Sequence, residues 1–85
     1  MSYPVEFTSA AARAFSKLTQ QVQKQLQGEI NELAVNPRSH GCKKLKGHSN
    51  RWRVRSGDYR VVYEVQDGLL LVLIVDIGHR SSIYN

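Results

Sequence analysis

The chain has 85 residues, 41% of them hydrophobic, and a formal net charge of +5. This length allows one domain with a modest core, and the hydrophobic fraction excludes a disordered chain. The longest apolar run, Leu69 to Val75, is well short of the roughly 18 residues that a membrane helix requires, and no secretory signal is visible. Cys42 is the only cysteine, which excludes an intrachain disulfide. We expect one cytoplasmic domain over residues 1–85 with no membrane partner.

The N-terminal segment predicts a strand followed by a helix. Residues 3–7 alternate, with Tyr3, Val5 and Phe7 on one face. Thr8 and Ser9 are good N-cap residues, and the alanines that follow favour a helix as far as Leu18.

A second helix is predicted from Gln20 to Ala34, with Thr19 as its N-cap. Asn36-Pro37 ends it, because the residue before a proline is disfavoured in helical conformation. One apolar stripe lies opposite a glutamine-rich face and consists of Val22, Leu26, Ile30 and Leu33.

From Lys43 onward the hydrophobic period changes from helical to two, which predicts strands. The last strand is apolar on both faces, as expected for a central strand. The predicted strands are Lys43–Lys46 at an edge, then 51–56, 59–65 and 69–77, with turns at 47–50, Gly57-Asp58 and 66–68.

The predicted element order is therefore β-α-α-β-β-β. This order indicates an α+β fold in which the two N-terminal helices pack on one face of a twisted, mainly antiparallel sheet. The other face of the sheet is then left to present polar side chains.

The positive charge is segregated along the chain. Eight of the twelve lysine and arginine residues, and only one acid, lie between Arg38 and Arg60, so this window carries a charge of +7 and the remainder −2. Such a patch is typical of polyanion binding, and the alternative is a solvated face that serves solubility.

Arg51, Arg53 and Arg55 alternate with Trp52 and Val54, which places three guanidinium groups on one face of a strand. Arginine stays charged at any working pH and binds phosphate bidentately. With Arg60 on the neighbouring strand, and with lysines 43, 44 and 46 nearby, these residues predict a phosphate-binding surface.

The C-terminal run places His79, Arg80 and Tyr84 directly after a strand that ends at Gly78. An imidazole, a guanidinium and a phenol at a strand end can supply acid–base groups, although each is also common as an ordinary surface or packing residue.

No metal or cofactor is predicted. His40, Cys42 and His48 lack a zinc-ligand spacing, and the acids form no evident paired site. Without a metal, RNA is still cleavable, because its ribose 2′-hydroxyl is an internal nucleophile that needs only a base, an acid and cations at the phosphate.

Three elements occur together and in order: Lys43-Lys44-Leu45-Lys46-Gly47, the run 52–65 that contains Gly57-Asp58-Tyr59-Arg60-Val61-Val62-Tyr63, and Ile77-Gly78-His79-Arg80 with Ile83-Tyr84. In these the sequence resembles the RelE/ParE superfamily of toxin–antitoxin toxins, and within it the RelE branch. The resemblance covers nearly the whole chain.

The resemblance implies a ribosome-dependent mRNA endonuclease that enters the decoding site and cuts by 2′-hydroxyl attack, without a metal. It implies an acidic, RelB-like antitoxin as partner. It also implies a proton-accepting role for Tyr84 and a phosphate-stabilising role for Arg80. Arg51 and Arg53 stand where some relatives carry lysines, and arginine is a poor proton donor or acceptor. The implied catalytic residues are Arg51, Arg53, Arg60, Arg80 and Tyr84, and the implied substrate-binding residues are Lys43, Lys44, Lys46, Arg55 and His79.

Two alternative functions remain open at this point. One is a ParE-like, gyrase-inhibiting toxin with no nuclease activity. The other is a non-catalytic module that binds nucleic acid through the basic patch alone. Within the leading interpretation, His79 competes with Tyr84 for the role of general base, because an unperturbed imidazole has a pKa of about 6.5.

Overall fold

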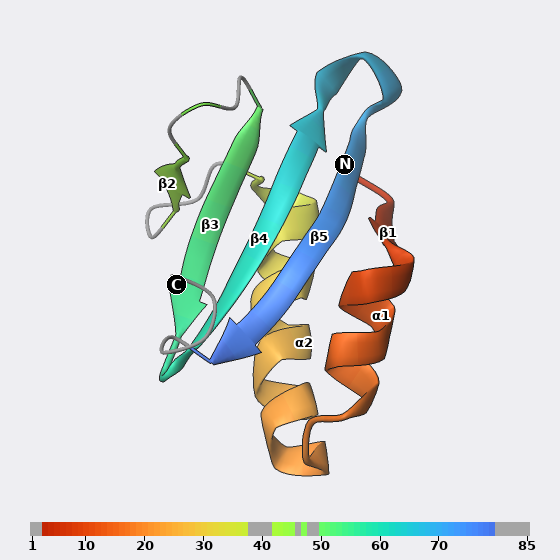
Figure 1. Cartoon of the computed structure of the whole chain (residues 1–85). Coiled ribbons are helices and arrows are strands. Elements are labelled where there is room, and N and C mark those ends of the chain that lie inside the picture. The colour runs from red at the N-terminus through yellow and green to blue at the C-terminus, as the bar shows by residue number, and fades with distance from the viewer. Residues whose placement is uncertain (1–2, 38–41, 46, 48–49, 80–85) are drawn as a thin grey trace.

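The computed structural model describes residues 3–37, 42–45, 47 and 50–79. Two helices lie on one face of a five-stranded sheet of order β1-β5-β4-β3-β2 (Figure 1). The sheet is antiparallel except that β1 pairs with β5 in parallel, which confirms the predicted α+β arrangement. The elements are β1 (Val5–Phe7), α1 (Ser9–Ser16), α2 (Gln20–Val35), β2 (Lys43–Lys44), β3 (Arg51–Ser56), β4 (Tyr59–Gln66) and β5 (Leu71–His79), with a 3-10 turn at Asp67–Leu69.

The core lies between the helices and the sheet. The predicted stripe of α2 is confirmed, since Leu26, Ile30 and Leu33 are buried and Val22 packs against them. Neither helix among the described residues is long and apolar enough to cross a membrane. The sheet contributes one face to this core through Val54, Val61, Tyr63, Val65, Val72, Ile74 and Ile77.

Threonine side chains begin both helices, as the sequence predicts. The hydroxyl of Thr8 accepts a hydrogen bond from the Ala11 amide at 3.1 Å, and that of Thr19 accepts one from Val22 at 3.3 Å. Helix α1 ends at Ser16, two residues before the predicted Leu18. Its last turn closes with i→i+3 bonds, from the Lys17 amide to Ala14 at 3.3 Å and from the Leu18 amide to Phe15 at 3.1 Å. Gln23 of α2 donates its side-chain amide to the Phe15 and Leu18 carbonyls, at 2.9 and 3.2 Å.

Strand β5 contains a bulge that changes the direction of every side chain after it. Val62 pairs with Asp76 but Tyr63 pairs with Ile74, so one extra residue, Val75, lies in β5. Without the bulge, strict alternation from Ile74 would turn Asp76 into the core. With it, Asp76 is exposed and Ile77 is buried.

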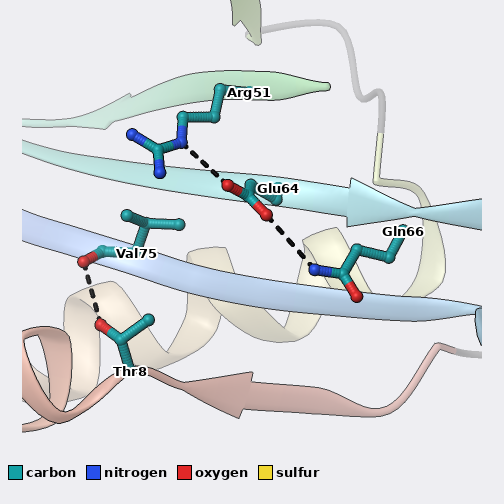
Figure 2. Close-up of polar contacts among 5 residues, drawn as sticks. All are labelled: Thr8, Arg51, Glu64, Gln66 and Val75. Atoms are coloured by element: carbon teal, nitrogen blue, oxygen red, sulfur yellow. Dashed lines mark hydrogen bonds and ion pairs between the residues drawn. The ribbon is translucent and has the colours of Figure 1, made fainter. Parts of the chain in front are cut away.

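Thr8 holds this bulge in place. Its hydroxyl donates to the Val75 carbonyl at 3.1 Å (Figure 2). Its backbone amide donates to the Ile74 carbonyl at 2.9 Å. The same hydroxyl accepts the α1 cap bond from Ala11. One side chain therefore fixes both the beginning of α1 and the phase of β5.

Two turns join the last three strands. Gly57, in the two-residue turn between β3 and β4, has a positive φ of 60°, and Gln25 of α2 donates to the neighbouring Ser56 hydroxyl at 3.0 Å. The turn between β4 and β5 is longer than predicted, because the 3-10 turn is followed by Leu70 in left-handed conformation with φ 51°. Strand β5 therefore begins at Leu71 instead of Leu69.

We predict that Gly57→Ala destabilises the protein by about 1–2 kcal/mol, because a side chain is strained in the left-handed region. An added Cβ would also lie 2.9 Å from the Gln25 amide nitrogen and disturb its bond to Ser56. Thermal unfolding followed by circular dichroism should show a lower Tm, by roughly 4–8 °C for each kcal/mol lost. Gly28→Ala is the control, since it lies in α2 with open space around it and should raise stability by about 0.5–1 kcal/mol. An unchanged Tm for Gly57→Ala would contradict the prediction.

Candidate functional site

The face of the sheet away from the helices carries the arginines of β3. Both helices lie on the other side (Figure 1). Val54 is buried against them, so its neighbours Arg53 and Arg55 project to the open face, together with Arg51. Arg51 and Arg53 are partly buried and Arg55 is exposed. The predicted alternation of the strand is confirmed.

Strand pairing adds one cation from each neighbouring strand. Lys43 of β2 lies directly opposite Arg53, and Arg60 of β4 lies directly opposite Arg55. Like charges directly opposite each other destabilise a sheet by up to about 1 kcal/mol per pair. We call this open-face group the cationic stripe; it consists of Lys43, Arg51, Arg53, Arg55 and Arg60.

Arg51 of the stripe is bound to an acid of the same sheet. Arg51 pairs with Glu64 in the register of β3 and β4, and its Nε lies 2.9 Å from Glu64 Oε2. Gln66 donates its side-chain amide to the other carboxylate oxygen, Oε1, at 3.3 Å (Figure 2). Arg51 is 33% exposed and Glu64 19%, so this ion pair is partly screened from water.

The cationic stripe has an acidic border on the side of β4, β5 and β1. Glu6 of β1 pairs with Leu73, which pairs with Glu64, so these residues share the open face. Asp76 pairs with Val62 on that face, and its carboxylate accepts from the Ile77 amide at 2.9 Å. A polyanion on this face is therefore favoured over β2 and β3 and disfavoured over β5 and β1.

Two of the predicted lysines differ in position. Lys44 pairs with Trp52, which places it on the opposite face of β2 from Lys43, although both are exposed. Lys46 lies outside the described residues, and the predicted edge strand 43–46 is confirmed as a strand only at Lys43–Lys44. Of the described lysines, Lys43 alone shares a face with the arginines.

His79 does not share the face of the cationic stripe. It pairs with Tyr59, which packs against the core on the helix side, and the two rings meet edge to face at 5.5 Å. The bulge at Val75 is the cause, since it reverses which residues of β5 face the helices. The predicted Arg80 and Tyr84 lie outside the described residues.

Glu64 and Gln66 are site residues that sequence reasoning missed. The signal was present, because a two-residue turn at Gly57-Asp58 sets Ser56 opposite Tyr59 and therefore Arg51 opposite Glu64. The charge count from Arg38 to Arg60 did not include Glu64, which lies four residues beyond Arg60, and so the pair was missed.

Other features of the described residues lie apart from the stripe. A hollow between the helices is lined by Phe15, Gln20, Gln23, Lys24 and Gln27, none of which is a predicted site residue. Across the part of the chain that the structure describes, no three histidine, cysteine or acidic side chains gather as metal ligands.

Residues 5–84 match the family model described as the ParE toxin of type II toxin–antitoxin systems, parDE. The chain belongs to this toxin family. The toxin is 32% identical over 89 residues to the mRNA interferase toxin RelE of Escherichia coli K12, a match that covers 100% of the chain and 93% of that relative. The resemblance to the RelE/ParE superfamily is thereby confirmed.

Solved structures agree with this assignment. The fold of the toxin is similar to that of the isolated E. coli RelE toxin, with a TM-score of 0.84 at 29% identity, covering 98% of this chain and 92% of that one. It is also similar to a chain of the intact E. coli RelBE toxin–antitoxin complex, with a TM-score of 0.82 at 30% identity, covering 92% of this chain and 96% of that one.

Proposed function

We propose that this toxin is an mRNA endonuclease that cuts message in the decoding site of the ribosome and so stops translation. The observation that carries the proposal is the cationic stripe, five basic residues on a sheet face that neither helix covers. The name of the E. coli relative, an mRNA interferase, supports the same activity.

The proposed chemistry needs no metal. The ribose 2′-oxygen attacks the adjacent phosphorus and the bond to the 5′-oxygen breaks, while one proton leaves the 2′-hydroxyl and another reaches the 5′-oxygen. Arginines stabilise the charge that develops on the phosphate, because guanidinium groups stay protonated throughout. In this proposal Arg53, Arg55 and Arg60 bind RNA phosphates.

The proton acceptor in this proposal is Tyr84, and Arg80 stabilises the phosphate. Both assignments rest on the family resemblance. A free tyrosine has a pKa of about 10 and is a poor base at neutral pH, so neighbouring cations must favour its phenolate. Arginine is unsuited to proton transfer, which leaves Arg51 and Arg53 as phosphate-binding cations.

We also propose an acidic antitoxin as partner. The solved complex of a similar toxin is described as RelBE, which supports a RelB-like protein. An acidic chain that folds on the open face would neutralise the stripe and block RNA.

A second function is favoured by one observation, the description of the matched family as ParE toxins. A ParE-like toxin would inhibit gyrase and leave RNA intact. Gyrase supercoiling in the presence of the purified toxin separates the two proposals, because an RNA-cleaving toxin leaves supercoiling unchanged.

We predict that cleavage requires a ribosome. Positioning by the ribosome is expected to contribute several kcal/mol, so message on programmed ribosomes should be cut at least about a thousandfold faster than the same purified message. Primer extension in a reconstituted translation mixture measures both rates. A message with a single 2′-deoxynucleotide at the cleaved position is the control and should stay intact there. Equal cutting of purified RNA, or cutting at the deoxynucleotide, would disprove the proposal.

We predict that adjacent lysines of β2 differ in RNA binding. Lys43→Ala removes a cation of the stripe, so the log–log salt slope of binding should fall by roughly 0.7, one phosphate contact. Lys44→Ala removes the same charge from the opposite face and should leave the slope nearly unchanged. Fluorescence titration with a short 2′-O-methyl RNA, which the toxin cannot cut, measures the slope. Equal losses in the two variants would show that the face is immaterial.

We predict that Tyr84→Phe lowers single-turnover cleavage on ribosomes by at least about a hundredfold, the scale of losing a general base. Ribosome affinity should stay nearly unchanged, because the aromatic ring remains. His79→Ala should cost less, in keeping with the position of His79 beside Tyr59 on the helix side of the sheet. Cleavage measured across pH decides between them: near wild-type cutting by Tyr84→Phe with a dead His79→Ala would reverse the assignment.

A further inference from the structure

The pair formed by Arg51 and Glu64 uses one edge of the guanidinium group. Glu64 Oε2 contacts the Nε of Arg51 at 2.9 Å. In Figure 2 the contact to Glu64 leaves from Nε, and one terminal nitrogen of Arg51 points away from Glu64. A guanidinium has five donors in a rigid fork, so an acceptor at Nε leaves the terminal end able to bind a second anion.

Glu64 is itself held in position. Its second oxygen accepts from Gln66, and its side chain is 19% exposed. Both residues belong to β4, and Glu64 lies directly opposite Arg51 in the sheet. The carboxylate therefore has little freedom to follow Arg51, and the orientation of the guanidinium is set by the strand.

We propose that Glu64 is a positioning residue, which with Gln66 fixes the Arg51 guanidinium so that its terminal nitrogens meet an RNA phosphate. This inference rests on the proposed RNA-cleaving function. Glu64 lowers the net positive charge of the stripe, so its presence opposes simple attraction of RNA. Its contribution lies in orientation, which is expressed in the rate of cleavage once RNA is bound.

The arrangement suits arginine and does not suit lysine. A lysine has a single ammonium group, a point charge without separate edges. At position 51 that ammonium would be bound by Glu64 and withdrawn from the phosphate. The effect of removing Glu64 should therefore depend on the residue at position 51.

The first test compares three variants in single-turnover cleavage of ribosome-bound message at saturating toxin, together with the affinity for the same ribosomes. Glu64→Ala should cut about tenfold more slowly with no loss of affinity, since Arg51 loses its acceptor and the face gains positive charge. Glu64→Gln should stay within about threefold of wild type, because its amide oxygen still accepts from Nε and Gln66 can rotate its own amide to match. Glu6→Gln is the charge-matched control, as Glu6 lies on the same face of the sheet but is separated from Arg51 by two strands, β5 and β4. It should cut at the wild-type rate.

The second test asks whether Glu64→Gln, which should not speed cleavage beside Arg51, does speed it when position 51 is a lysine. In an Arg51→Lys background, Glu64→Gln should raise the cleavage rate at saturation by at least about threefold, because the ammonium is released to the phosphate. A purely structural Glu64 would give the same loss in both backgrounds. Glutamate and glutamine have nearly the same shape, so Glu64→Gln should fold. The comparison of the two backgrounds therefore tests the positioning role even if Glu64→Ala fails to fold.

Three outcomes overturn the inference: Glu64→Ala cutting at the wild-type saturating rate, Glu64→Gln losing as much as Glu64→Ala, or no gain in the Arg51→Lys background. Failure of the proposed function looks different, since the wild-type toxin would then cut no ribosome-bound message. If the wild-type toxin cuts and one of these three outcomes is found, the RNA-cleaving function stands and only the positioning role of Glu64 is disproved.

Discussion

The hydroxyl of Thr8 joins the first helix to the last strand of the sheet. It caps α1 through Ala11 and binds the bulged carbonyl of Val75, so the first helix and the last strand are fixed together. The extra residue in β5 turns Ile77 into the core and Asp76 to the open face. A buried carboxylate at position 76 would cost several kcal/mol, because no opposite charge lies among the buried residues that the structure describes.

The division of the sheet into two faces explains how a small basic protein keeps its charges together. The helices bury one face, and Val54 of β3 points to it, so the arginines that alternate with Val54 lie on the open face. Cross-strand pairs such as Arg55 with Arg60 are unfavourable in the free protein. An anionic partner, whether RNA or an antitoxin, would relieve that repulsion, which couples the proposed binding to the stability of the sheet.

The ion pair between Arg51 and Glu64 makes the arginines of β3 unequal. A strand of arginines suggests uniform attraction of phosphate, but one of them is bound on its Nε edge and the sheet beyond it is acidic. The charge on the open face is therefore uneven, with cations over β2 and β3 and carboxylates toward β1. Such a border favours one path for a polyanion across the face.

The order and type of the main helices and strands, both helix caps, the buried stripe of α2 and the shared face of Arg51, Arg53 and Arg55 could all be predicted from the sequence, although α1, β2 and β5 have other bounds than predicted. These features follow from contacts within a few residues, where hydrogen bonding and alternation are local. The pairing of Arg51 with Glu64 was implied by the two-residue turn at Gly57-Asp58, although charge counting did not find it. The direction of the side chains after the bulge in β5, and with it the face of His79, could not be predicted from the sequence. The bulge that sets both depends on a hydrogen bond between residues 67 positions apart, and no local pattern encodes a contact of that range.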